Sequence, residues 1–135
     1  PNEKIAWTAN LIFGAGTIPR ARSGGVAAYR STLIKMAATI APATIVSGHG
    51  AITDGKTVTD YLTYLDNVLT SAAQAVERGA SAESLYASAT LDDNDSIAPN
   101  LLQLMTGFHR WNLQAAFAEA KQAQASRAAQ PVARP

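Results

Sequence analysis

The clearest pattern along the chain is a stripe of apolar side chains at helical spacing between residues 57 and 76. Thr57 is a residue type that often caps a helix, and Asp60 follows three positions later, so a helix is expected to begin at Thr57. Gly79 should close it, because glycine commonly ends helices in the left-handed conformation. The apolar residues at this spacing are Val58, Tyr61, Leu62, Leu65, Val68, Leu69, Ala72 and Val76.

Three further helices are expected. One should open at Ser23 and end before Pro42, because proline cannot continue a helix. Ser81 should cap a short helix that runs through Tyr86, and a final helix should begin near Pro99. The apolar positions of the first are Val26, Tyr29, Leu33, Met36 and Ala37, and those of the last are Leu101, Leu104, Met105, Phe108, Leu113 and Phe117.

Two segments favour β-structure. Residues Ile5 to Phe13 mix β-branched, aromatic and aliphatic side chains, which predicts a buried strand that runs into a loop. Ala43 to Val46 predicts a short second strand, and the glycine-rich stretch 14–25 between them predicts an irregular loop. The order of strands and helices indicates an α/β layer. Because an isolated pair of strands is only marginally stable, further strands should come from the loops or from another chain.

The composition is that of one folded domain. With 135 residues, 47% hydrophobic and 16% charged, the chain is expected to form a single α/β domain over residues 1–124, followed by a flexible tail at 125–135. The net charge is +1 and the basic residues are scattered, so neither nucleic acid nor an anionic membrane is an expected partner. No run of about 18 apolar residues is present, so no membrane span is expected.

Cysteine is absent, which excludes disulfides, thiolate metal sites and cysteine nucleophiles. Any metal ion must therefore be bound by His, Asp or Glu, and the chain has only two histidines. The first residues, Pro1-Asn2-Glu3-Lys4, do not have the pattern of a signal peptide. A soluble protein of the cytoplasm or periplasm is expected, although the sequence does not decide between these locations.

Three segments together resemble the C-terminal half of a metallo-β-lactamase-fold hydrolase. These are residues 7–13 (Trp-Thr-Ala-Asn-Leu-Ile-Phe), residues 45–50 (Ile-Val-Ser-Gly-His-Gly) and residues 53–55 (Thr-Asp-Gly). Tyr29, Leu33 and the segment His109-Arg110-Trp111-Asn112 are also similar to that family, so the resemblance covers nearly the whole chain. It implies half of an αββα sandwich, completed by oligomerisation.

The resemblance assigns His49 and Asn10 as catalytic residues and His49 as a metal ligand. A neutral imidazole at the end of a strand is a suitable zinc ligand. Asn10 occupies the position of the family's bridging aspartate, and an amide is a poorer bridge between two cations because it carries no charge. The family's other histidines precede the region covered here, so zinc would need ligands from a complementary N-terminal half or from a second copy.

Three more residues are candidates for substrate binding. Arg20 and Arg22, on the predicted loop, could hold an anionic substrate through paired hydrogen bonds, and Ser47 lies two positions before His49 in the sequence. Without the resemblance, the alternative interpretations are a solvated surface for the arginines, a turn residue for His49 and a packing or capping role for His109.

Three functions follow as hypotheses. The first is metal-dependent hydrolysis, in which metal-activated water attacks a small-molecule ester, phosphoester, sulfate ester or lactam. The second is a non-catalytic half-domain that dimerises through an apolar surface and an exposed strand edge. The third is metal-independent hydrolysis with His49 as general base near Ser47 and Thr53.

Overall fold

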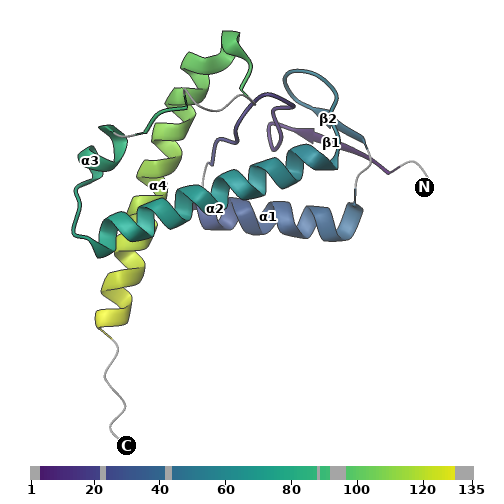
Figure 1. The fold of residues 1–135 in the computed structure, drawn as a ribbon. Helices are drawn as coiled ribbons and strands as arrows, with labels where there is room; N and C mark the ends of the chain where they lie inside the picture. Colours follow the sequence, from purple (N-terminus) through teal and green to yellow (C-terminus); the bar gives the residue numbers. More distant parts are fainter. Residues whose placement is uncertain (1–3, 22–23, 42–43, 88, 92–96, 130–135) are drawn as a thin grey trace, which may run out of the picture.

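The computed structural model describes residues 4–21, 24–41, 44–87, 89–91 and 97–129. Figure 1 shows α1 and α2 side by side, with the small sheet near one end of the pair and α4 crossing α2. The fold is mixed α/β and mostly helical, so the coarse α/β prediction is confirmed. The elements are β1 (Ile5–Ala9), α1 (Gly25–Ile40), β2 (Thr44–Ser47), α2 (Gly55–Glu77), α3 (Ala82–Ala87), the 3-10 helix η1 (Pro99–Leu101) and α4 (Leu102–Ala128).

The sheet in the described residues consists of two parallel strands. Ile5 pairs with Thr44, and the register shifts between Trp7 and Ala9 before Ala9 pairs with Ser47. On the far side of β2, Ile45 forms a single antiparallel bridge with Thr53. Because a parallel pair needs a crossover connection, α1 joins the two strands.

The expected strand over residues 5–13 is shorter and less buried than predicted. β1 ends at Ala9, which adopts a positive φ of 44°, and the Leu11 N–H then donates to the Thr8 carbonyl in a turn. Within β1, Ala6 and Thr8 are buried, whereas Ile5 is 47% and Trp7 is 82% exposed. The prediction that this strand is buried was wrong, because helices cover only one face of the sheet.

The main core lies between the inner sheet face and the three long helices. Its buried members include Ile45 from β2, Leu33 from α1, Tyr61 and Leu65 from α2, and Leu113 from α4. A side chain of this size contributes about 1.5–3 kcal/mol when buried. The stripe at residues 58–76 supplies most of the α2 contribution, as its helical spacing predicted.

The start of α2 differs from the prediction. Asp54, not Thr57, is the N-cap, and its carboxylate accepts from the Lys56 N–H at 2.9 Å. Thr57 lies inside the first turn, where it is buried and its hydroxyl bonds that of Thr53 at 2.5 Å. Gly79 does follow the helix end, with φ 67°. The Ser81 hydroxyl accepts from the Ser84 N–H, as expected of the residue that caps α3.

The helix α4 buries Met105, Leu113 and Phe117, but Leu104 is 53% exposed, so its assignment to the buried face was wrong. Leu104 lies one position before Met105 and therefore about 100° around the helix from it. The helix continues to Ala128, beyond the expected domain boundary at Gln124. The expected start of α1 at Ser23 and the remainder of the tail, 130–135, lie outside the described residues.

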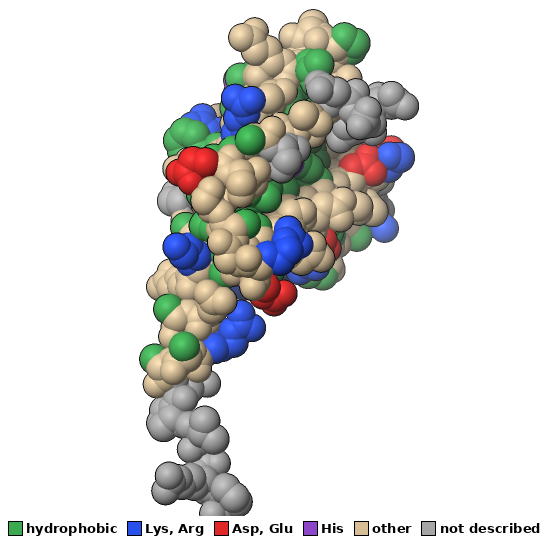
Figure 2. Space-filling view, turned by 60° about the vertical axis from the view of Figure 1, so that its left-hand side comes forward, with side chains coloured by type: hydrophobic (Ala, Val, Ile, Leu, Met, Phe, Trp, Pro, Cys, Tyr) green, Lys and Arg blue, Asp and Glu red, His purple; other side chains and the backbone are tan. Residues whose placement is uncertain are grey.

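The surface has no concentrated charge on the face shown in Figure 2, where basic and acidic side chains are scattered among apolar ones. This agrees with the net charge of +1. None of the helices in the described segments combines the length with the apolarity that a bilayer-spanning helix requires.

Candidate functional site

The carboxyl ends of β1 and β2 bring the two predicted loops into contact. The Gly48 N–H donates to the Ala9 carbonyl at 2.8 Å. A Cβ atom at Gly48 would lie 2.6 Å from the Ala9 carbonyl carbon and 2.8 Å from Asn10 Oδ1, so only glycine permits this approach. The fold therefore places Asn10 beside the turn that carries His49.

His49 is exposed and stacks on Phe13. The two ring centroids lie 5.4 Å apart with an interplanar angle of 14°. Offset stacking of this kind is worth about 0.5–1.5 kcal/mol and limits the orientations of the imidazole. Within the described chain, no hydrogen bond occupies either ring nitrogen of His49, so both remain available to a ligand.

Two tyrosines, one partly and one fully buried, hold the loop that follows Asn10. Tyr29 of α1 donates its hydroxyl proton to the Leu11 carbonyl. Tyr61 of α2, 1% exposed, accepts from the Phe13 N–H at 3.2 Å and bonds the Thr17 hydroxyl at 2.5 Å. Desolvation by burial raises the pKa of Tyr29 and of Tyr61, so both phenols stay protonated and can donate. These contacts fix Phe13, and with it the surface on which His49 stacks.

Arg20 lies over two aromatic rings of α4. Its guanidinium carbon is 4.5 Å from the Trp111 ring centroid and 5.5 Å from that of Phe108. Its Nε is buried and has no hydrogen-bond partner among the described residues, and no described carboxylate forms an ion pair with it. Phe108 in turn contacts Phe13, with centroids 5.6 Å apart, so aromatic rings connect Arg20 with His49. The other candidate arginine, Arg22, lies outside the described residues.

Asn112, which the resemblance includes only as part of a segment, fixes the backbone on both sides of Arg20. Its Oδ1 accepts from the Ala21 N–H at 2.9 Å, and its Nδ2 donates to the Pro19 carbonyl at 2.7 Å. Asn112 is completely buried. Its i,i+3 spacing from His109 places both on one helix face, which is the signal the sequence offered for it.

Ser47 acts within its own turn. Its hydroxyl donates to the His49 carbonyl at 2.8 Å and also lies 3.3 Å from the Ala51 carbonyl. The hydroxyl of Thr53 bonds Thr57. Neither hydroxyl is hydrogen-bonded to the His49 ring, so this arrangement offers no support for a nucleophile activated by His49 as general base.

His109 lies away from this edge. Its Nδ1 is 2.9 Å from the Tyr64 hydroxyl, between α4 and α2. Burial lowers the pKa of His109 below its ordinary value of 6.5. His109 is partly buried between the two helices and makes a specific hydrogen bond that the sequence did not indicate.

The donor set at the sheet edge does not by itself fit a catalytic zinc ion. Zinc sites of that kind use three protein ligands and an open position, and the edge offers one imidazole and the neutral amide of Asn10. Among the described residues, no three His, Asp or Glu side chains gather closely enough to hold a metal ion. Any metal at His49 needs ligands from another polypeptide segment.

Comparison of the sequence with protein-family models and with curated proteins finds no match.

Proposed function

We propose that the carboxyl edge of the sheet is one half of a metal-dependent hydrolase site of the metallo-β-lactamase type. The observation that carries the proposal is the meeting of two loops at the ends of adjacent parallel strands, where Asn10 lies against the turn of His49. His49 is the metal ligand contributed by this chain, and Asn10 is a neutral, weaker one. The reaction class is hydrolysis of an ester, phosphoester, sulfate ester or lactam.

A second copy of the chain is the partner we propose for this site. Two copies related by a two-fold axis would bring two His49 imidazoles and two Asn10 amide oxygens to one point, which makes four donors. The outer face of the sheet supplies a surface on which such a copy could pack, since Ile5, Trp7 and the nearby Ile52 are 47%, 82% and 67% exposed. Large apolar side chains grouped on a surface are typical of an interaction site.

Arg20 is the residue we propose for binding an anionic group of the substrate. Its guanidinium lies over the Trp111 ring and lacks a carboxylate partner in the described chain. A stacked guanidinium can still donate hydrogen bonds from its edge to a carboxylate, sulfate or phosphate oxygen. Ring contacts through Phe108 and Phe13 link this cation to His49.

The test is a calorimetric titration of the purified chain with Zn²⁺, combined with analytical ultracentrifugation with and without the metal. We expect one zinc ion per two chains and dimers that zinc strengthens. His49→Ala should abolish zinc binding, whereas His109→Gln, which changes the chain's other histidine, should retain it. Failure of the wild-type chain to bind zinc, or equal binding by His49→Ala, would overturn the proposal.

The exposed sheet face also favours a second candidate, a non-catalytic module that dimerises. The supporting observation is Trp7, which is 82% exposed on a strand whose other face is buried. Dimers that form without binding zinc, and that are unchanged by His49→Ala, would support this candidate over the hydrolase.

A further inference from the structure

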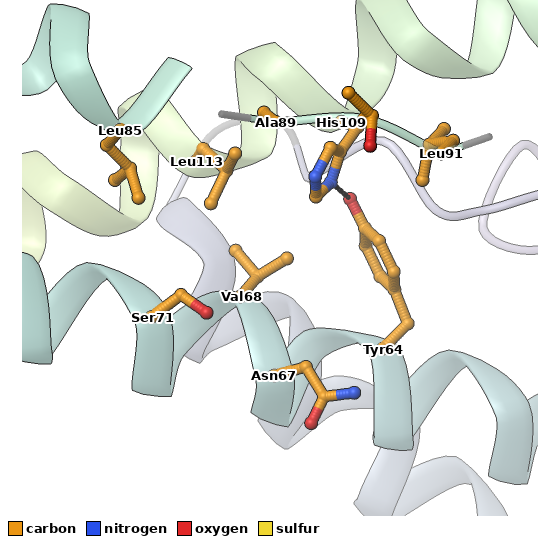
Figure 3. A pocket seen from close by; sticks show the side chains of 10 residues that line it. Tyr64, Asn67, Val68, Ser71, Leu85, Ala89, Leu91, His109 and Leu113 are labelled. Carbon is orange, nitrogen blue, oxygen red and sulfur yellow. Dashed lines mark hydrogen bonds between the residues drawn. The ribbon is translucent and has the colours of Figure 1, made fainter. Parts of the chain in front are cut away.

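A second concave site lies between α2, α3 and α4, separate from the sheet edge. This open cleft has a volume of about 450 Å³, within the range of about 300–1,000 Å³ that small-molecule sites occupy. Figure 3 shows Tyr64, Val68 and Ser71 on α2 facing His109 and Leu113 on α4, with Leu85 and Leu91 at opposite sides. The remaining lining residues are Asn67, Ala89 and Thr90.

The hydrogen bonds behind this cleft determine which nitrogen of His109 carries its proton. Asn112 Oδ1 must accept from the Ala21 N–H, so the Asn112 NH₂ group points the other way and donates to the Tyr64 hydroxyl at 3.0 Å. Tyr64 thus accepts from Asn112, and its own proton is directed to His109 Nδ1 at 2.9 Å. The neutral tautomer of His109 with the proton on Nε2 completes this chain.

The Nε2–H group of His109 is then a hydrogen-bond donor fixed in position. No hydrogen bond joins Nε2 to another residue in the described part of the chain. A donor held by a relay through Tyr64 and Asn112 is preorganised, because Asn112 is fully buried and has its amide bonded on both sides. Such a group can receive an acceptor atom of a ligand without rearrangement of the protein.

The walls of the cleft indicate the chemical class of that ligand. Among the described residues that line the cleft, none is Asp, Glu, Lys or Arg, and its apolar part consists of Val68, Leu85, Ala89, Leu91 and Leu113. An ionised ligand would lose its hydration there without gaining an opposite charge, whereas an uncharged carbonyl loses much less. Ser71 and Asn67 on α2 are exposed and leave the cleft open to solvent on that side.

We propose that this cleft binds an uncharged organic molecule with an aliphatic body and a carbonyl group, such as an amide or ester, whose oxygen accepts from His109 Nε2. The site is distinct from the sheet edge and does not depend on the function proposed for His49.

The experiment uses hexanamide as the probe and the imidazole ¹⁵N resonances as the readout. Because the chain has two histidines, His49→Ala assigns both sets of signals. We expect hexanamide to shift the His109 Nε2 resonance saturably, with a Kd of about 1 mM for a ligand of this size. Hexanoate and hexylammonium, which have the same chain but a charged end, should bind at least about tenfold more weakly.

Two blocking variants keep the result specific. Ser71→Phe places a large side chain at the rim from an exposed position, and Thr90→Trp does so from the loop on the other side. Both variants should abolish the shift of the His109 Nε2 resonance. Thr70→Phe is the control, because Thr70 is exposed, precedes Ser71 and does not line the cleft, and it should leave the shift unchanged. The absence of a saturable shift with wild-type chain, or an equal shift in both blocking variants, would overturn the proposal.

Discussion

Several side chains in this molecule hydrogen-bond to backbone atoms of segments that are distant in the sequence. Asn112 is the clearest case, since it bonds the backbone of Pro19 and Ala21 and so presents Arg20 to the rings of α4. Each such hydrogen bond contributes about 0.5–1.5 kcal/mol, and removal of one partner leaves a buried polar group without a bond. The position of Arg20 is therefore set by the core and not by the loop alone.

His109 should make stability depend on pH. Its folded-state pKa is lowered by burial, so the unfolded chain binds a proton more readily than the folded chain does. The stabilising contribution is present above the unfolded pKa of 6.5 and is lost as pH falls through the lower, folded pKa. Urea unfolding of the wild type at about pH 7.5 and about pH 5.5 should show lower free energy of unfolding in acid.

His109→Gln should reduce this pH dependence, because glutamine does not titrate. Gln114→Ala, which changes an exposed, uncharged residue of the same helix, is the control and should leave the slope unchanged. Equal slopes for the wild type and His109→Gln would show that burial does not shift the titration of this histidine.

At the residue level, the sequence predicted the position of the loops better than the contacts within them. The pattern around Gly48 placed His49 at a strand end, and Asn10 lies beside that turn. By contrast, the roles of Asn112, Phe108 and Trp111 depend on which helix face meets the 13–21 loop, a tertiary contact that spacing alone does not specify. Thr57 was mistaken for the N-cap because both Thr and Asp side chains can accept a hydrogen bond from a helix N–H group, and Asp54, three residues earlier, is the one that does so.

Among the elements, the helix α1 is capped from another part of the chain. Its N-cap residue, Gly24, has no side chain, and the Glu119 carboxylate of α4 accepts instead from the N–H groups of Val26 at 2.5 Å and Ala27 at 3.2 Å. A carboxylate at a helix N-terminus also interacts favourably with the helix dipole. A Cβ atom at Gly25 would overlap this carboxylate, so glycine at this position makes room for the cap.

Glu119→Ala should destabilise the fold by about 1–2 kcal/mol, because it leaves two N–H groups without their acceptor. Glu77→Ala removes the same charge from an exposed position near the end of α2 and serves as the control. Chemical denaturation followed by circular dichroism measures both. Equal stability of Glu119→Ala and Glu77→Ala would show that solvent replaces the cap without loss.

Helices were more predictable than strands in this chain. The 3.6-residue period is a local property, and the apolar stripe of α2 follows it from Val58 to Val76. A strand's length and burial depend on what pairs with it and what covers it, and one face of β1 is left uncovered. The apolar run from Ile5 to Phe13 therefore suggested a longer and more buried strand than the five residues that form.

At the scale of the whole molecule, the sheet separates a covered face from an open one. Ile45 is completely buried against the helices, whereas Trp7, on the neighbouring strand, is 82% exposed. A two-stranded sheet with one face in water is marginal by itself, so association through this face would stabilise it. In the two-fold arrangement proposed above, this association brings two carboxyl edges, each with one His49, toward each other.

Trp7→Asp should separate association from folding. Because the Trp7 side chain is largely exposed, the substitution should change the free energy of unfolding of the monomer by less than about 0.5 kcal/mol. A charge on the outer face of the sheet should raise the dissociation constant of the proposed dimer at least about tenfold, as measured by analytical ultracentrifugation with Zn²⁺ present. Leu104→Asp is the control. It changes an exposed apolar residue on α4, away from the sheet, and should leave dimerisation unaffected. If Trp7→Asp dimerises as strongly as the wild type, the copies do not meet through the outer sheet face, and the two His49 side chains are not brought together by it.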